Sequence, residues 1–146
     1  LLGKAEEMVE QQKQELAECP EQADSWVLLV VADMYAQRYE EAYDLVQQAM
    51  ERFPEEWELF IHACNIARHL EKYPEAIRYA DRAIAMRPAY VDGMYEKAWC
   101  YKKMGKNREA GCLYLEIAEA LKRDGFEVEA ETELRNARKL LERAET

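Results

Sequence analysis

Apolar residues recur along most of this chain at intervals of three and four positions, with polar residues between them. Trp26, Leu29 and Val30 show this spacing, which places them on one face of an α-helix. The stretch Val27–Val31 is strand-like when taken alone, because β-branched residues favour strands. The corresponding stretches 34 and 68 residues further on are not strand-like. We therefore predict helices throughout, including at Val27–Val31.

Several residue types recur every 34 residues. The recurring positions are Pro20, Pro54 and Pro88; Ala42, Ala76 and Ala110; Glu41, Glu75 and Glu109; and Tyr39 and Tyr73. A 34-residue period is typical of helical hairpins that stack on one another. One hairpin cannot bury its apolar face alone, so neighbouring hairpins must pack into an array. We therefore predict three such units, at residues 23–56, 57–90 and 91–124.

These units resemble the tetratricopeptide repeat. In that family the first helix of a unit carries a large residue, Leu, a small residue and Tyr, and the second carries alanines and a closing Pro. The residues that carry the resemblance are Trp26, Leu29, Ala42, Ala49 and Pro54; then Phe60, Ala63, Cys64, Ala76, Ala83 and Pro88; then Met94, Ala98, Tyr101, Ala110 and Ile117. The pattern departs at Val30, where Gly or Ala is usual, and at Asp33, where Tyr is common. The resemblance implies an all-α fold, a right-handed superhelical array of antiparallel helix pairs.

Helices are also expected on both flanks of the three units. Residues 1–22 should contain an N-terminal helix, at residues 3–18, that resembles the second helix of an earlier repeat. Residues 125–146 should form a C-terminal capping helix. Its early residues are acidic and its late residues basic, an order that complements the helix dipole. With these flanks, residues 1–146 make up one domain.

Turn residues indicate where several helices start and stop. Pro54 and Pro88 should end the second helices of the first two units, because proline clashes with a continuing helix. Gly105 suits a helix C-terminus that needs a positive φ angle. The second helix of unit three is expected to run on to Asp124, with Gly125 as its stop. Ser25, or alternatively Asp24, is expected to cap the first helix of unit one.

The resemblance implies a ligand site as well, since in this family the first helix of each unit lines a concave groove. The residues selected as a peptide-binding groove are Val27, Val31, Ile61, Asn65, Arg68, Tyr95, Trp99 and Lys102. Aliphatic and aromatic residues form its floor, Asn65 can hydrogen-bond a peptide backbone, and Arg68, Lys102 and Lys103 form a basic rim. Aromatic residues and Arg are enriched in binding hot spots. We predict a peptide or helical segment with apolar anchors and some acidic character. The alternative is that Tyr95 and Trp99 pack as ordinary core.

One subclass of the family binds the acidic C-termini of heat-shock chaperones through a carboxylate clamp of Lys, Asn and Arg side chains. If the three units here correspond to the three units of that clamp, its positions hold Val27, Val31, His62, Asp92 and Glu96. None of these is a clamp residue, so binding of chaperone tails is not expected.

Net charge narrows the class of partner. The 146 residues include 20 basic and 30 acidic ones, a formal charge of −10 at pH 7. This balance argues against nucleic acid, which needs a basic face, and against an anionic membrane surface. Residues 1–56 carry 4 basic and 14 acidic side chains. This acidic block can steer a basic partner or a basic neighbouring domain, and the alternative is that it is simply solvated. The longest apolar run, Val27–Ala32, is too short to span a membrane.

No pattern in the sequence indicates catalysis, a metal or a cofactor. The four cysteines lack CxxC spacing and are expected to be buried thiols of a cytoplasmic protein: Cys19, Cys64, Cys100 and Cys112. His62 and His69 lie seven positions apart, without the further close ligands that zinc requires. A Gly-rich phosphate loop and a Ser–His–acid set are both missing from the sequence.

The sequence therefore predicts a non-catalytic module that binds another protein in its groove. Two other functions stay open. The array can be a structural scaffold that associates with itself, or a regulatory or targeting domain of a larger enzyme. The second of these is kept because the chain does not begin with Met.

Overall fold

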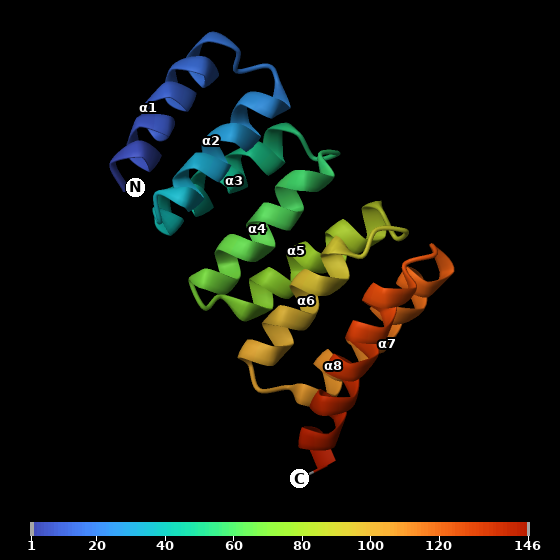
Figure 1. The fold of residues 1–146 in the computed structure, drawn as a ribbon. Coiled ribbons are helices and arrows are strands. Elements are labelled where there is room, and N and C mark those ends of the chain that lie inside the picture. Colours follow the sequence, from blue (N-terminus) through green and yellow to red (C-terminus); the bar gives the residue numbers. More distant parts are fainter. Residues whose placement is uncertain (1, 146) are drawn as a thin grey trace.

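The computed structural model describes residues 2–145, and all regular secondary structure in that range is α-helical. The helices are α1 (Leu2–Glu18), α2 (Ala23–Tyr35), α3 (Tyr39–Arg52), α4 (Trp57–His69), α5 (Tyr73–Met86), α6 (Asp92–Lys103), α7 (Asn107–Arg123) and α8 (Glu127–Glu145). They follow one another along an elongated array whose two termini lie at opposite ends (Figure 1). The predicted all-α fold is confirmed.

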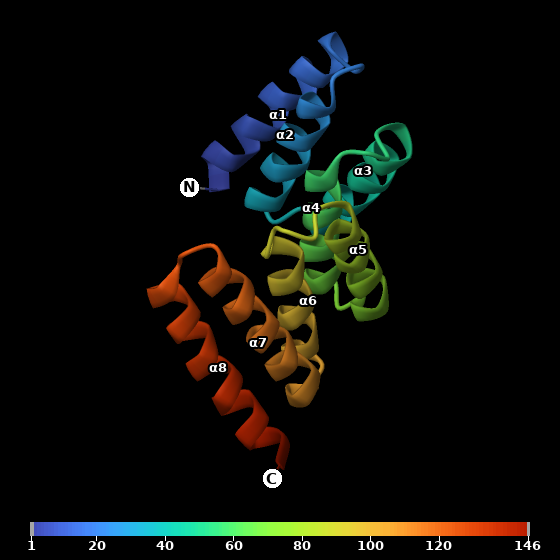
Figure 2. The ribbon, with the colours of Figure 1, turned by 90° about the vertical axis from the view of Figure 1, so that its right-hand side faces the viewer.

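Consecutive helices pack against each other as pairs, and the pairs stack. The pairs α2–α3, α4–α5 and α6–α7 lie within the three units predicted from the 34-residue period. The helix α4 also packs on both α2 and α6, so the first helices of the three units form a continuous layer. Figure 2 shows this layer running down the molecule, with α3 and α5 beside it. We call α2, α4 and α6 the A helices. At the ends, α1 packs along α2 and α8 along α7.

The core combines small side chains at the helix contacts with larger ones between them. The helix contacts are made by fully buried alanines such as Ala42, Ala76 and Ala98, because close helix packing needs small residues there. Leu59, Ile66 and Ile117 are the largest fully buried side chains among the described residues. One core cluster joins α2 to α6, a second joins α6 to α8, and a third joins α1 to α2. The array is therefore held by successive local cores.

The turns inside the three units share a left-handed residue. These residues are Gln37, Glu71 and Gly105, with φ angles of 61°, 60° and 76°, and they stand 34 positions apart. Gly105 was predicted for this role, whereas Gln37 and Glu71 were not. Gly125, with a φ angle of 89°, follows α7 as predicted. The left-handed region is unfavourable for residues other than glycine, so units one and two have strained turns.

The predicted cap at the start of α2 is wrong. The helix begins at Ala23, so Asp24 and Ser25 lie inside its first turn, and Ser25 is buried. The backbone N–H of Ser25 donates to the Gln22 carbonyl. Gln22 is the N-cap residue, but its side chain makes no capping hydrogen bond. The indole of Trp26 donates to the carbonyl of Pro20 at 2.8 Å, which ties the entering chain to the helix.

Candidate binding surface

The A helices carry two hollows on successive helix pairs, one between α2 and α4 and the other between α4 and α6. Each is bordered by an aromatic side chain that is open to solvent: Tyr35 is 70% exposed and Trp99 is 38% exposed. Large exposed aromatic residues at a hollow are typical of binding sites rather than of ordinary surface. We call the surface with both hollows the A-helix face.

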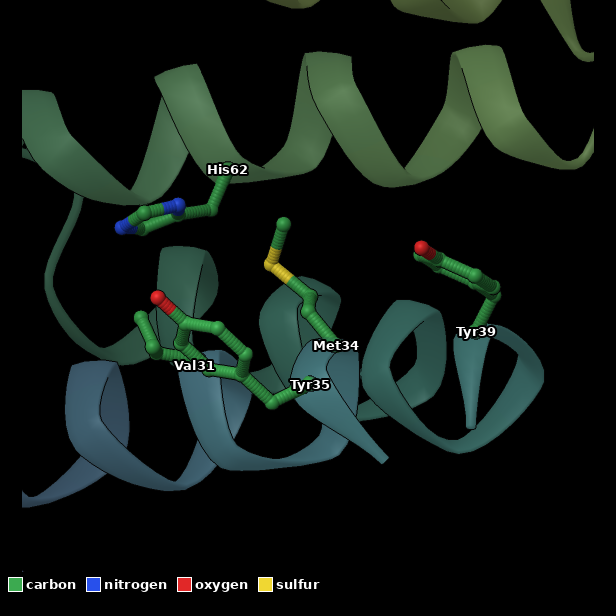
Figure 3. A pocket seen from close by; sticks show the side chains of 5 residues that line it. All are labelled: Val31, Met34, Tyr35, Tyr39 and His62. Carbon is green, nitrogen blue, oxygen red and sulfur yellow. The ribbon is translucent and has the colours of Figure 1, made fainter. Parts of the chain in front are cut away.

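The first hollow is apolar and has a volume of about 340 Å³. It is lined by Val31, Met34, Tyr35, Tyr39 and His62. In Figure 3, His62 extends from α4 over Val31 and Tyr35 of α2, and Met34 lies between His62 and Tyr39. The only ionisable groups in this lining are the His62 imidazole and two tyrosine hydroxyls. Burial lowers the pKa of His62, while the carboxylate of Glu58 raises it, so the neutral imidazole is favoured.

Tyr39 is held at the edge of this hollow by a second histidine. Its ring stacks on that of His69, with centroids 4.4 Å apart and planes at 8°. The Nδ1 atom of His69 lies 2.9 Å from the backbone carbonyl of Asn65. The start of α3 is thus fixed against the end of α4, which gives the apolar hollow a defined wall.

The second hollow is basic and has a volume of about 390 Å³. It is lined by Arg68, Trp99, Lys102 and Lys103. The guanidinium carbon of Arg68 lies 5.4 Å from the centroid of the Trp99 ring, and Nζ of Lys102 lies 5.8 Å from that of Tyr114. Both distances are typical of cation–π contacts. The hollow therefore offers an aromatic surface bordered by positive charge.

The carboxylate of Glu96 neutralises much of the positive charge of Arg68. The Nη2 atom of Arg68 lies 3.5 Å from Oε2 of Glu96, and the two side chains are only 14% and 9% exposed. Burial raises the pKa of Glu96, although Arg68 and a hydrogen bond from Asn65 lower it. The charge that faces solvent in the basic hollow thus comes mainly from Lys102 and Lys103, which are both exposed.

The structure brings some of the predicted groove residues together and separates others. Val31 lines the apolar hollow, and Arg68, Trp99 and Lys102 line the basic one. Val27 does not lie on this surface, because it packs in the core cluster and is 7% exposed. Ile61 is half-buried and lines neither hollow.

The remaining two predicted residues are partly engaged within the chain. The Asn65 side chain is half-buried and bonds to Glu96. Tyr95 is half-buried against Trp99 and Tyr114, with centroids 5.8 Å and 6.2 Å away. Burial and a hydrogen bond to Glu133 raise the pKa of Tyr95. The alternative that these two aromatic residues pack as core therefore fits Tyr95. It fits Trp99 less well, because Trp99 is open to solvent.

Four residues that line the apolar hollow were not among the eight selected groove residues: Met34, Tyr35, Tyr39 and His62. The family pattern places groove residues on the first helix of each unit, whereas Tyr39 begins the second helix. A signal was present, since Tyr39 and Tyr73 belong to the 34-residue series. The prediction that all four cysteines are buried was also incorrect. All four are free thiols, but Cys112 is exposed and Cys19 is half-buried.

Within residues 2–145, no three His, Cys, Asp or Glu side chains gather as ligands for a metal ion. None of the eight helices in this range has the length and apolar character needed to cross a membrane.

Comparison with known proteins identifies the fold. No protein-family model and no curated protein sequence matches the chain. A crystal structure of MamA is similar over 97% of this chain and 91% of that chain, with a TM-score of 0.68 and 18% identity. The Yersinia enterocolitica type III secretion translocator chaperone SycD is similar over 85% of this chain and 95% of that chain, with a TM-score of 0.74 and 14% identity. The chain has a tetratricopeptide-like helical-repeat fold.

Proposed function

We propose that this protein is a non-catalytic interaction module and that its A-helix face binds a segment of a partner protein. The observation that carries the proposal is the pair of hollows on successive A helices, each bordered by an exposed aromatic side chain. Aromatic side chains in partly enclosed positions contribute much of the binding energy at protein interfaces. One structure of similar fold is named as a chaperone, which agrees with a partner that is a protein.

The chemistry of the two hollows specifies the segment. A large aliphatic or aromatic side chain fits the apolar hollow, because most of its lining surface is apolar. An Asp or Glu side chain fits the basic hollow, where Lys102 and Lys103 are exposed and Glu96 already pairs with Arg68. The proposed ligand is therefore an extended or helical segment with an apolar anchor followed or preceded by an acidic residue.

A random-peptide display selection on the intact chain tests this function. Selected peptides should bind the Tyr35→Ala and Trp99→Ala variants at least tenfold more weakly than the wild type, because each change removes an exposed aromatic contact. A tenfold loss of affinity corresponds to about 1.4 kcal/mol of binding free energy. Fluorescence anisotropy measures the affinities, and circular dichroism with urea unfolding confirms that each variant is folded.

Phe126→Ala is the matched control. Phe126 is an exposed aromatic residue in the turn between α7 and α8 and lines neither hollow. Equal affinities for Phe126→Ala and the wild type are expected. Peptides that bind Tyr35→Ala and Trp99→Ala as tightly as the wild type would overturn the proposal.

The acidic part of the proposal has its own test. A Lys102→Glu, Lys103→Glu double variant should lose affinity for the selected peptides, and the wild-type affinity should fall as NaCl is raised from 50 to 300 mM. Retained affinity in the double variant would leave the apolar hollow as a binding site but reject the acidic ligand.

A further inference from the structure

Two buried cysteines face each other across the contact between α4 and α6. The Sγ atoms of Cys64 and Cys100 lie 3.9 Å apart, and both residues are fully buried. A disulfide needs an Sγ–Sγ distance of about 2.0 Å, so the two sulfurs must approach by roughly 2 Å. The other two thiols lie elsewhere on the molecule: Cys19 directly follows α1, and Cys112 lies on α7.

The surroundings of the pair make the two thiols unequal. Arg68 lies one turn after Cys64, and Glu96 lies one turn before Cys100, where they form their ion pair. The hydrogen bond with Cys64 lowers the pKa of Cys100; burial opposes this and the Arg68 guanidinium supports it. The same hydrogen bond, together with burial, raises the pKa of Cys64. Of the two thiols, Cys100 is therefore the one whose ionisation these surroundings favour.

We propose that Cys64 and Cys100 form a reversible disulfide site that joins α4 to α6 when the protein meets hydrogen peroxide. The thiolate of Cys100 attacks one peroxide oxygen, the O–O bond breaks, and Cys100 becomes a sulfenic acid while hydroxide leaves. The sulfur of Cys64 then attacks the sulfur of Cys100. The S–O bond breaks, the Cys64 proton and the leaving hydroxide form water, and the disulfide remains. The two thiols lose two electrons in total, and the peroxide accepts them. A dithiol reductant returns the pair to the free form by thiol–disulfide exchange.

The position of the pair gives the cross-link a structural consequence. Cys64 and Cys100 belong to neighbouring A helices and are 36 residues apart. Their disulfide closes a loop that contains the whole of α5, which restricts the unfolded chain. Arg68 connects the pair to the basic hollow, because it flanks the cysteines and also lines that hollow. The proposal does not depend on the function of the A-helix face, since the reaction needs only the two sulfurs and peroxide.

The experiment uses the full chain and a Cys19→Ala, Cys112→Ala variant that keeps only the buried pair. The folded proteins are treated with hydrogen peroxide, and unreacted thiols are blocked with iodoacetamide. The intact mass should fall by two hydrogens with no added blocking groups on the pair. A non-reducing tryptic digest should show residues 53–68 linked to residues 98–102. The oxidised protein should melt about 5–15 °C higher than the reduced one, and a dithiol reductant should reverse the shift.

A third variant separates the two steps. In the Cys19→Ala, Cys64→Ala, Cys112→Ala variant, Cys100 has no partner, and its sulfenic acid should be trapped by dimedone. The proposal is overturned if the folded protein keeps both thiols while the urea-unfolded protein forms the disulfide. It is also overturned if Cys100 is oxidised to sulfinic acid without any linked peptides, or if oxidation leaves the melting temperature unchanged. Circular dichroism of each reduced variant checks that the fold is intact.

Discussion

Arg68 is a charged residue that is nearly buried on the A-helix face. It is 14% exposed, forms an ion pair with Glu96 and lies over the ring of Trp99. Its Nε atom has no hydrogen-bond partner. Removing one partner of a buried ion pair leaves the other charge buried and uncompensated, which costs more than the pair contributes. Arg68 therefore stabilises the fold as well as shaping the basic hollow.

An Arg68→Ala variant should be destabilised in a pH-dependent way. At pH 7 the expected loss is about 3–5 kcal/mol of unfolding free energy, because Glu96 is left buried and charged. Without Arg68, the folded-state pKa of Glu96 rises further above its ordinary value of 4.5. Below pH 4.5 Glu96 is mostly protonated in both the folded and the unfolded state. The loss of unfolding free energy should therefore be smaller at pH 4 and should grow as the pH rises. Urea unfolding of variant and wild type at both pH values measures this.

Arg78→Ala is the control for this prediction. Arg78 forms an ion pair with Glu75 in which the side chains are 69% and 36% exposed. Such pairs contribute about 0–1 kcal/mol, so little change is expected at either pH. A loss for Arg68→Ala that is the same at pH 4 and pH 7 would contradict the assignment of Glu96 as the buried charge.

At the level of single residues, the lining of the basic hollow could be predicted from the sequence better than the lining of the apolar hollow. Trp99, Lys102 and Arg68 were found because the repeat pattern assigns each of them to the open side of a first helix. Val27 was misplaced because an aliphatic residue at such a slot can turn to either the core or the face. Nothing in the linear order links Arg68 to Glu96, 28 residues away. Pairings of this kind depend on how neighbouring units stack.

At the element scale, the helices and their order were predictable and the strain in their turns was not. The 34-residue period fixes the helices because each unit must bury the same positions. It also aligns Gln37 and Glu71 with Gly105, yet a glutamine and a glutamate carry no local signal for a left-handed conformation. Only the alignment with Gly105 identifies these two positions.

Gln37→Gly should stabilise the protein. Relief of the left-handed strain exceeds the entropy that glycine loses on folding, so a gain of about 0.5–1 kcal/mol is expected. Gln47→Gly, the same change at an exposed position inside α3, should instead cost about 1 kcal/mol. Urea unfolding of both variants shows whether each change raises or lowers the free energy of unfolding. A loss of stability for Gln37→Gly would show that the turn is not strained.

The close contact between α7 and α8 gives a second element-scale prediction. A Cβ atom at Gly111 would lie 2.8 Å from Cγ of Leu141, so Gly111→Ala should push the helices apart and cost about 1–3 kcal/mol. The cost should shrink in a Leu141→Ala background, because the two side chains then no longer collide. Gly3→Ala has free space around it and should be neutral or slightly stabilising. Equal costs for Gly111→Ala in both backgrounds would contradict this packing.

At the scale of the whole molecule, the A helices form one layer that presents the two hollows, and the second helices support it. This division follows from stacking, since each first helix contacts the first helix of the next unit. The fold could be predicted from the period alone. The location of the hollows could not, because it depends on which side chains the stacking leaves open, as with Tyr35 and Tyr39.

NMR mapping tests directly whether the A-helix face is the surface that binds the partner. A peptide from the display selection is titrated into the ¹⁵N-labelled chain, and the amide shifts are followed. The largest changes should fall on residues 31–39, 61–69 and 95–103, around the two hollows. Changes confined to α3, α5 and α7, or to α8, would contradict this assignment.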